Sequence, residues 1–128
     1  MSRGSRSDCN PIIVDDKGSD VRILERIPFV RGNFDESWLQ ELIRKTPSVV
    51  PSGEFEAVFA RLAAIGREVG TAVGPIDNMF ISADGYLVLV ETKLWRNPEA
   101  RREVVGQILD YAKEIARWTF EDLDQTVR

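Results

Sequence analysis

The fold is decided by the stretch IDNMFISADGYLVLVETK, residues 76–93. Residues 86–93 are rich in the β-branched and aromatic side chains that strands favour, and residues 76–82 have a similar character. Between them, Ala83, Asp84 and Gly85 are typical of a tight turn. The stretch therefore predicts two antiparallel strands joined by a hairpin turn.

The second of these strands has two apolar faces before its charged end. Tyr86, Val88 and Val90 share one face, and Leu87 and Leu89 share the other. Two apolar faces are typical of a strand in the middle of a sheet, so we expect it to be central and covered on both sides by helices.

The charged end of the strand carries residues that can do chemistry. Glu91 and Lys93 continue the Leu87 and Leu89 face, about 6.6 Å apart, so both side chains can reach one small ion and its bound water. Pairing residues symmetrically about the turn sets Asp77 roughly opposite Glu91. We therefore expect two carboxylates and an amine to meet where the sheet reaches the surface. The alternative is a surface cluster of ion pairs.

Composition limits the chemistry of such a cluster. The chain has no histidine, which excludes a Ser-His-Asp or Cys-His mechanism, a His-ligated zinc site and a histidine general base. Carboxylates, lysine and a metal remain, and hard oxygen ligands favour Mg²⁺ or Mn²⁺. Such an ion can polarise a phosphoryl oxygen and acidify its bound water.

Cysteine use and hydropathy indicate the compartment. Cys9 is the one cysteine, so an internal disulfide is excluded, which fits a reducing cytoplasm. The first eight residues lack the apolar core of a signal peptide, and no apolar run approaches membrane-spanning length. We expect a soluble, cytoplasmic protein with no membrane partner.

Length and charge bear on domain count and partners. A chain of 128 residues is one domain by the usual prior. Its net charge of −4 gives no global attraction to nucleic acid, so binding needs a local basic patch. The expected patch contains Lys93, Arg96, Arg101 and Arg102, with Trp95 as a stacking surface. The alternative is that Arg96 and Arg102 are solvated charges and Trp95 is a core residue.

We expect three regions along the chain. Residues 1–33 hold a frayed tail and an accessory hairpin of residues 12–14 and 21–25, which can serve as a flap, an edge or an oligomer contact. Residues 34–120 form the core, and residues 121–128 form a C-terminal tail. Within the core, helical spacing predicts a short helix between residues 51 and 64, and residues 67–69 lead into the sheet.

A helix is expected over residues 36–45, capped at Asp35 and stopped by Pro47. Its buried side carries Leu39, Leu42 and Ile43. Glu36 lies on that side and so points toward the core or its rim, whereas Glu41 points to water. An acid at the positive end of a helix is favourable by ~0.3–1 kcal/mol, but this does not explain the inward direction. Glu36 is therefore a candidate for function.

A longer helix is expected over residues 98–118, with Asn97 as N-cap and Pro98 in its first position. Its apolar face groups Val104, Val105, Ile108, Tyr111, Ala112 and Ile115. Gln107 borders that face and can bind a metal's water or a phosphate oxygen; the alternative is a half-exposed side chain bonded to a loop. Arg101 projects toward the apolar side and can hold a phosphate beside Lys93.

Three motifs together resemble a known family. They are GPID at residues 74–77, LVETK at residues 89–93 and QILDY at residues 107–111. On a strand-turn-strand pair followed by a helix, they resemble the PD-(D/E)XK, or restriction-endonuclease-like, nuclease superfamily, in its RecB-like branch or an uncharacterised bacterial group. The resemblance covers about residues 34–118.

The resemblance implies an α/β fold with an αβββαβ core, in which helices flank a mixed sheet. It implies Glu36, Asp77 and Glu91 as metal ligands, Lys93 as the residue that orients or activates the attacking water, and Gln107 as the motif glutamine. The expected nucleic-acid-binding residues are Arg96, Arg101, Arg102 and Tyr111. The implied activity is Mg²⁺- or Mn²⁺-dependent hydrolysis of phosphodiester bonds in DNA, with RNA possible, leaving a 5′-phosphate and a 3′-hydroxyl.

The chain departs from the family in two respects. The family has a fourth core strand after the second helix, whereas residues 118–128 are typical of a loop or helix. Either the chain is the front part of a longer protein, or the hairpin or a partner chain, as in a homodimer, completes the sheet. The acidic balance is poor for a DNA binder acting alone. The alternative function is a catalytically weak nucleic-acid-binding or interaction module of a larger assembly.

Overall fold

The computed structural model describes residues 10–25, 27, 34–94 and 100–128, with only the backbone of residues 100 and 101. The chain divides into two compact units between Val30 and Arg31. The described residues form two antiparallel sheets and three α-helices, so the expected α/β class is confirmed. The expected mixed sheet is wrong, because every strand pairing among these residues is antiparallel.

The first unit contains the expected hairpin. Strand β1 (Ile12–Val14) pairs with β2 (Val21–Ile23). The Asp15 carboxylate closes the loop by accepting hydrogen bonds from the Ser19 hydroxyl at 2.7 Å and the Asp20 N–H at 3.0 Å. These bonds, with that of Ser19 first, hold the pKa of Asp15 below its ordinary value.

The second unit is built on a three-stranded sheet. Its order is β3 (Leu62–Thr71), β4 (Gly74–Ser82) and β5 (Leu87–Val90). The central strand is β4, in which residues 76–80 are all buried. The expectation that β5 is central is wrong, because its only described pairing is with β4. Its two apolar faces are explained by helices above and below the sheet.

The turn between β4 and β5 is the one expected, and the strand beyond it is shorter. Gly85 has φ +85°, which a glycine adopts without steric cost, and the Ser82 N–H donates to the Tyr86 carbonyl at 2.8 Å. Strand β5 ends at Val90 rather than at Lys93. Past this point the Thr92 N–H bonds to the Asp77 side chain instead of a neighbouring strand.

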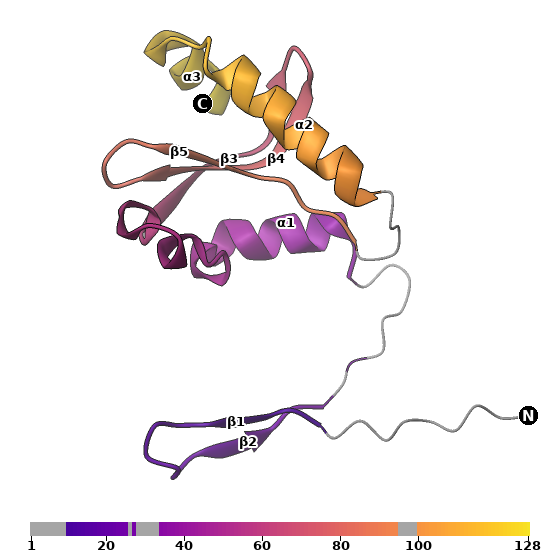
Figure 1. Ribbon diagram of the computed structural model, residues 1–128, viewed down its shortest axis with the longest axis vertical. Coiled ribbons are helices and arrows are strands. Elements are labelled where there is room, and N and C mark those ends of the chain that lie inside the picture. The colour runs from indigo at the N-terminus through magenta and orange to yellow at the C-terminus, as the bar shows by residue number, and fades with distance from the viewer. Residues whose placement is uncertain (1–9, 26, 28–33, 95–99) are drawn as a thin grey trace, which may run out of the picture. The chain divides into compact units, whose positions relative to one another are not determined.

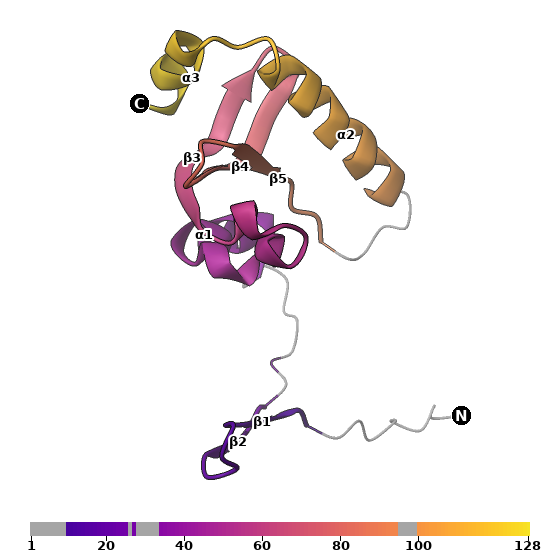
Figure 2. The ribbon, with the colours of Figure 1, turned by 60° about the vertical axis from the view of Figure 1, so that its left-hand side comes forward.

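Helix α1 (Glu36–Lys45) has the expected bounds. Asp35 caps it by accepting from the Trp38 N–H at 2.7 Å, and Pro47 opens the 3-10 turn that follows. The Asn78 side chain, buried in β4, donates to the Gln40 carbonyl at 3.1 Å. Helix α1 therefore packs on one face of the sheet, with α2 on the opposite face (Figures 1 and 2).

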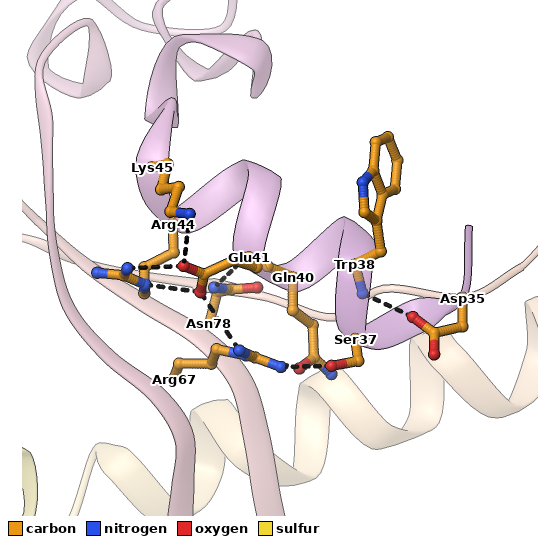
Figure 3. Close-up of polar contacts among 9 residues, drawn as sticks. All are labelled: Asp35, Ser37, Trp38, Gln40, Glu41, Arg44, Lys45, Arg67 and Asn78. Atoms are coloured by element: carbon orange, nitrogen blue, oxygen red, sulfur yellow. Dashed lines mark hydrogen bonds and ion pairs between the residues drawn. The ribbon is translucent and has the colours of Figure 1, made fainter. Parts of the chain in front are cut away.

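Arg67 of β3 fastens α1 to the sheet (Figure 3). Its guanidinium donates to the Ser37 hydroxyl at 2.7 Å, the Gln40 side chain at 3.1 Å and the Glu41 carboxylate at 3.3 Å. Glu41 also pairs with Arg44 at 2.8 Å. Glu41, which was expected to point to water, is partly exposed, and its carboxylate also contacts Arg67 of the sheet.

Helix α2 (Ala100–Ile115) ends three residues earlier than expected, and the expected cap lies outside the described residues. Tyr111 is buried with Val69, Ile76 and Met79 in the core. Val105 is 58 % exposed and Ala112 is exposed too, so their expected place on the buried face is wrong. The other residues of this face, Val104, Ile108, Tyr111 and Ile115, are buried or half-buried.

Residues 121–128 are not a tail. Nearly all of them lie in α3 (Phe120–Val127), which begins with a capping box between Thr119 and Asp122. Leu123 and Val127 pack against the core cluster. This burial explains why the segment is ordered as a helix.

The short helix expected between residues 51 and 64 is also wrong. Two 3-10 turns, Ser52–Glu54 and Ala57–Phe59, precede β3 instead. The Ser52 hydroxyl donates to the Phe59 carbonyl at 2.7 Å, and Gly53 lies too close to Ala60 for any larger residue. This local bonding competes with an α-helix.

No helix in the part of the chain that the structure describes has the length and apolar content needed to cross a bilayer.

Candidate metal centre

Two acids lie just past the paired part of β4 and β5. The pairing ends at Asn78 and Val90, and Asp77 and Glu91 are the next residues beyond this last pair. The negative charge of Asp77 raises the pKa of Glu91, so the two carboxylates are close enough to interact. Asp77 is 8 % exposed, and the Glu91 side chain is 2 % exposed. The tight turn at Gly85 fixes this register, because a shift by one residue would turn every side chain of β5 to the other face.

Glu91 is a buried acid with one satisfied oxygen. Its Oε1 lies 2.9 Å from the ammonium Nζ of Lys93, whereas Oε2 is buried and has no hydrogen-bond partner among the described residues. Burial raises the pKa of Glu91, the bond from Lys93 opposes this rise, and the charges of Asp77 and Glu36 add to it. A buried oxygen without a donor is a place for a proton or a cation.

Lys93 is held in its charged form. The hydrogen bond to Glu91 is the main cause that raises the pKa of Lys93, and the charges of Glu91, Glu36 and Asp77 act in the same direction. Its side chain is 33 % exposed, so the ammonium reaches solvent. At neutral pH this amine is a donor of hydrogen bonds and a positive charge.

Asp77 is oriented by Thr92. The Asp77 oxygen Oδ2 accepts the Thr92 N–H at 2.7 Å and the Thr92 hydroxyl at 2.8 Å. Thr92 is 4 % exposed. Sequence reasoning gave this residue no role, although a hydroxyl on the face of Val88 and Val90 was a signal, because a buried hydroxyl needs a partner.

Glu36 reaches the same region from α1. Its Oε1 accepts the N–H of Leu94 at 3.2 Å, one residue after Lys93, and its charge raises the pKa of both Glu91 and Lys93. The inward direction expected for Glu36 is therefore what the structure has. Arg67, also missed by sequence reasoning, holds the helix that carries it.

The residues fit a metal held by two carboxylates and water. Among the described residues, no group of three or more Asp, Glu or Cys side chains is close enough to hold an ion. Mg²⁺ usually keeps several waters and takes only one or two carboxylates from a protein. Asp77 and Glu91 supply two, and the unpartnered Glu91 Oε2 is suited to a cation. Glu36, bonded to Leu94, lies near this pair rather than within it.

Gln107 and Tyr111 form a hydrogen-bonded chain that ends at the start of β4. The Gln107 amide donates to the Tyr111 hydroxyl at 2.8 Å, which donates to the Pro75 carbonyl at 2.7 Å. Gln107 is half-buried, and Tyr111 is 2 % exposed, which leaves it no open face for a nucleic acid. The two residues tie α2 to the start of β4, two positions before Asp77.

The structure leaves most of the expected basic patch undescribed. Arg96 and Trp95 lie outside the described residues, and Arg101 is placed in the first turn of α2 by its backbone alone. Arg102 is exposed. The site therefore brings together Glu36, Asp77, Glu91 and Lys93, whereas Gln107 and Tyr111 bond to one another and to Pro75.

Comparison with models of protein families, with curated proteins and with solved structures finds no match to this chain.

Proposed function

We propose that the chain is a metal-dependent nuclease that hydrolyses phosphodiester bonds of DNA, with Mg²⁺ or Mn²⁺ as its cofactor and a restriction-endonuclease-like core. The observation that carries the proposal is a pair of buried, interacting acids, Asp77 and Glu91, with the Lys93 ammonium 2.9 Å from Glu91. The element order α1, β3, β4, β5, α2 is the one that the proposal requires.

Each residue of the site has a role that its surroundings favour. Asp77 and Glu91 would hold the cation, which would supply Lewis acidity and lower the pKa of a bound water. Lys93 stays protonated, so it orients the attacking water and stabilises negative charge at phosphorus rather than acting as a base. The water oxygen bonds to phosphorus as the bond to the 3′ oxygen breaks; the attacking water gives up a proton to solvent and the 3′ oxygen takes one from solvent, which leaves a 5′-phosphate and a 3′-hydroxyl.

Glu36, Gln107 and Tyr111 support the centre. Glu36 adds negative charge near the cation site and joins α1 to the segment after β5. Gln107 and Tyr111 fix the start of β4. We assign contact with the nucleic-acid backbone to Arg102, which is exposed, and to Arg96 and Arg101 from their place in the sequence.

One observation favours a second function, a catalytically weak nucleic-acid-binding or interaction module of a larger assembly. Among the described residues, no group of three or more acids is close enough to hold an ion. The net charge of −4 favours the interaction module over the nucleic-acid-binding one. In that case the acids and Lys93 are the remains of a catalytic centre within a larger assembly.

The deciding experiment is cleavage of labelled DNA and RNA with Mg²⁺, with Mn²⁺ and with a chelator. We expect metal-dependent cleavage of DNA and a loss of about 10²–10³ in rate for Lys93→Ala, as for removal of one donor to a transition-state oxyanion. The matched control is Lys113→Ala, because Lys113 is an exposed lysine in the last turn of α2. Equal low activity of the wild type and Lys93→Ala would favour the second function.

A further inference from the structure

Thr92 bonds to the candidate metal ligand with both of its donors. The N–H and the hydroxyl of Thr92 reach the same oxygen, Asp77 Oδ2, at 2.7 and 2.8 Å. The two side chains are 4 % and 8 % exposed, so water competes little for these bonds. No hydrogen bond within the described residues ends on the other oxygen, Oδ1.

Two donors on one oxygen restrict the carboxylate far more than one does. The terminal torsion of an aspartate is broad and close to two-fold, so an unrestrained carboxylate samples many orientations. Hydrogen bonds from the Thr92 hydroxyl and backbone fix the plane of the group. They leave Oδ1 as the Asp77 oxygen that would be available to a cation.

The same bonds place the segment that follows β5. Strand β5 ends at Val90, and the Thr92 N–H takes the Asp77 side chain as its acceptor in place of a strand carbonyl. Glu91 and Lys93 are the neighbours of Thr92 in the chain, so the bond from Thr92 to Asp77 also restricts where they lie. This one contact thus helps to position all three groups of the site.

We infer that Thr92 is a positioning residue of the proposed nuclease, whose hydroxyl orients the Asp77 carboxylate for binding of a divalent cation. This inference rests on the proposed function. Residues that orient metal ligands through hydrogen bonds typically contribute a factor of about 10–100 to metal affinity. The hydroxyl of Thr92 is the donor that a substitution can remove, since the backbone N–H stays.

The test is Mn²⁺ binding to the full chain, measured by titration calorimetry on folded protein. Thr92→Val keeps the β-branched shape and the N–H and removes only the hydroxyl, so we expect binding about 10- to 100-fold weaker. Thr92→Ser keeps the hydroxyl and should retain most of the affinity. The control is Thr126→Val, because Thr126 is an exposed threonine of α3 bonded within its own helix.

The outcomes separate this inference from the proposed function. Wild-type affinity in Thr92→Val would overturn the role of Thr92 while leaving the nuclease proposal intact. Absence of Mn²⁺ binding and of cleavage in the wild type would overturn both. If Thr92→Val does not fold, Thr92→Ser and Thr92→Ala replace it: weak binding by alanine with near-normal binding by serine supports the inference, and equal affinity overturns it.

Discussion

Replacing Glu91 by glutamine tests whether the buried carboxylate lowers the stability of the metal-free protein. The carboxylate is almost fully buried, its Oε2 has no partner among the described residues, and burial raises its pKa. Ionised Glu91 is therefore unfavourable without a metal, and glutamine removes the charge while keeping the shape. We expect Glu91→Gln to be at least as stable as the wild type in the absence of metal.

The magnitude follows from three opposing contributions. Attraction between Glu91 and Lys93 is about 4 kcal/mol for charges ~4 Å apart at an effective dielectric constant of ~20, and less because Lys93 is partly exposed. Repulsion from Asp77 at ~5 Å is about 3 kcal/mol under the same conditions. The attraction and the repulsion nearly cancel, so the cost of burying the carboxylate decides whether Glu91→Gln is more or less stable than the wild type. We expect a gain of about 1 kcal/mol, or roughly 4–8 °C in Tm.

With Mn²⁺ bound, the wild type should become more stable than Glu91→Gln. At a concentration about 100 times its Kd, a bound ligand adds about 2.7 kcal/mol to the stability of the wild type, roughly 10–20 °C in Tm. Glu91→Gln lacks the carboxylate that would hold Mn²⁺, so its stability should not rise. Thermal unfolding with and without Mn²⁺ measures both effects.

The control for this experiment is Glu103→Gln, since Glu103 is an exposed acid in the first turn of α2. It should melt like the wild type and respond to Mn²⁺ in the same way. An equal response of Glu91→Gln and the wild type would refute the reasoning. A metal-free Glu91→Gln protein that melts far below the wild type would instead show that the pair with Lys93 is structural.

Two further predictions concern Arg67 and Glu41, whose contact joins β3 to α1. Arg67→Met should lower the free energy of unfolding by about 1–3 kcal/mol, because Ser37, Gln40 and Glu41 all lose a donor. Urea unfolding measures this change, and an unchanged midpoint would contradict the role of Arg67 in holding α1 on the sheet. The contribution of Glu41 should depend on pH, because the hydrogen bond from Arg44, followed by that from Lys45, lowers the pKa of Glu41 from 4.5 to about 2. Its folded pKa is below its unfolded value, so the stabilisation is complete above 4.5 and is lost as the pH falls toward 2. Melting temperatures of the wild type and Glu41→Gln should therefore differ at neutral pH and converge in acid, and a constant difference would argue against the ion pair.

Much of the second unit could be predicted from local patterns. β-branched and aromatic residues and the turn at Gly85 predict β4, β5 and their register, and this register brings Asp77 and Glu91 to the same end of the two strands. Asp35 and Pro47 mark the ends of α1. These features depend on side-chain period, capping and turn geometry, which involve residues close together in the chain.

The sequence by itself thus determined α1, β4 and the turn into β5, and with them the end of the sheet at which Asp77 and Glu91 lie, because capping, strand period and turn length act over a few residues. The tertiary structure alone decided that β5 pairs only with β4 among the described strands, that Tyr111 is buried, that Arg67 bonds to Glu41, and that Thr92 bonds to Asp77. The last two contacts join positions 26 and 15 residues apart. Periodicity carries no information about such contacts, because packing and hydrogen-bond partners are fixed only when the layers come together.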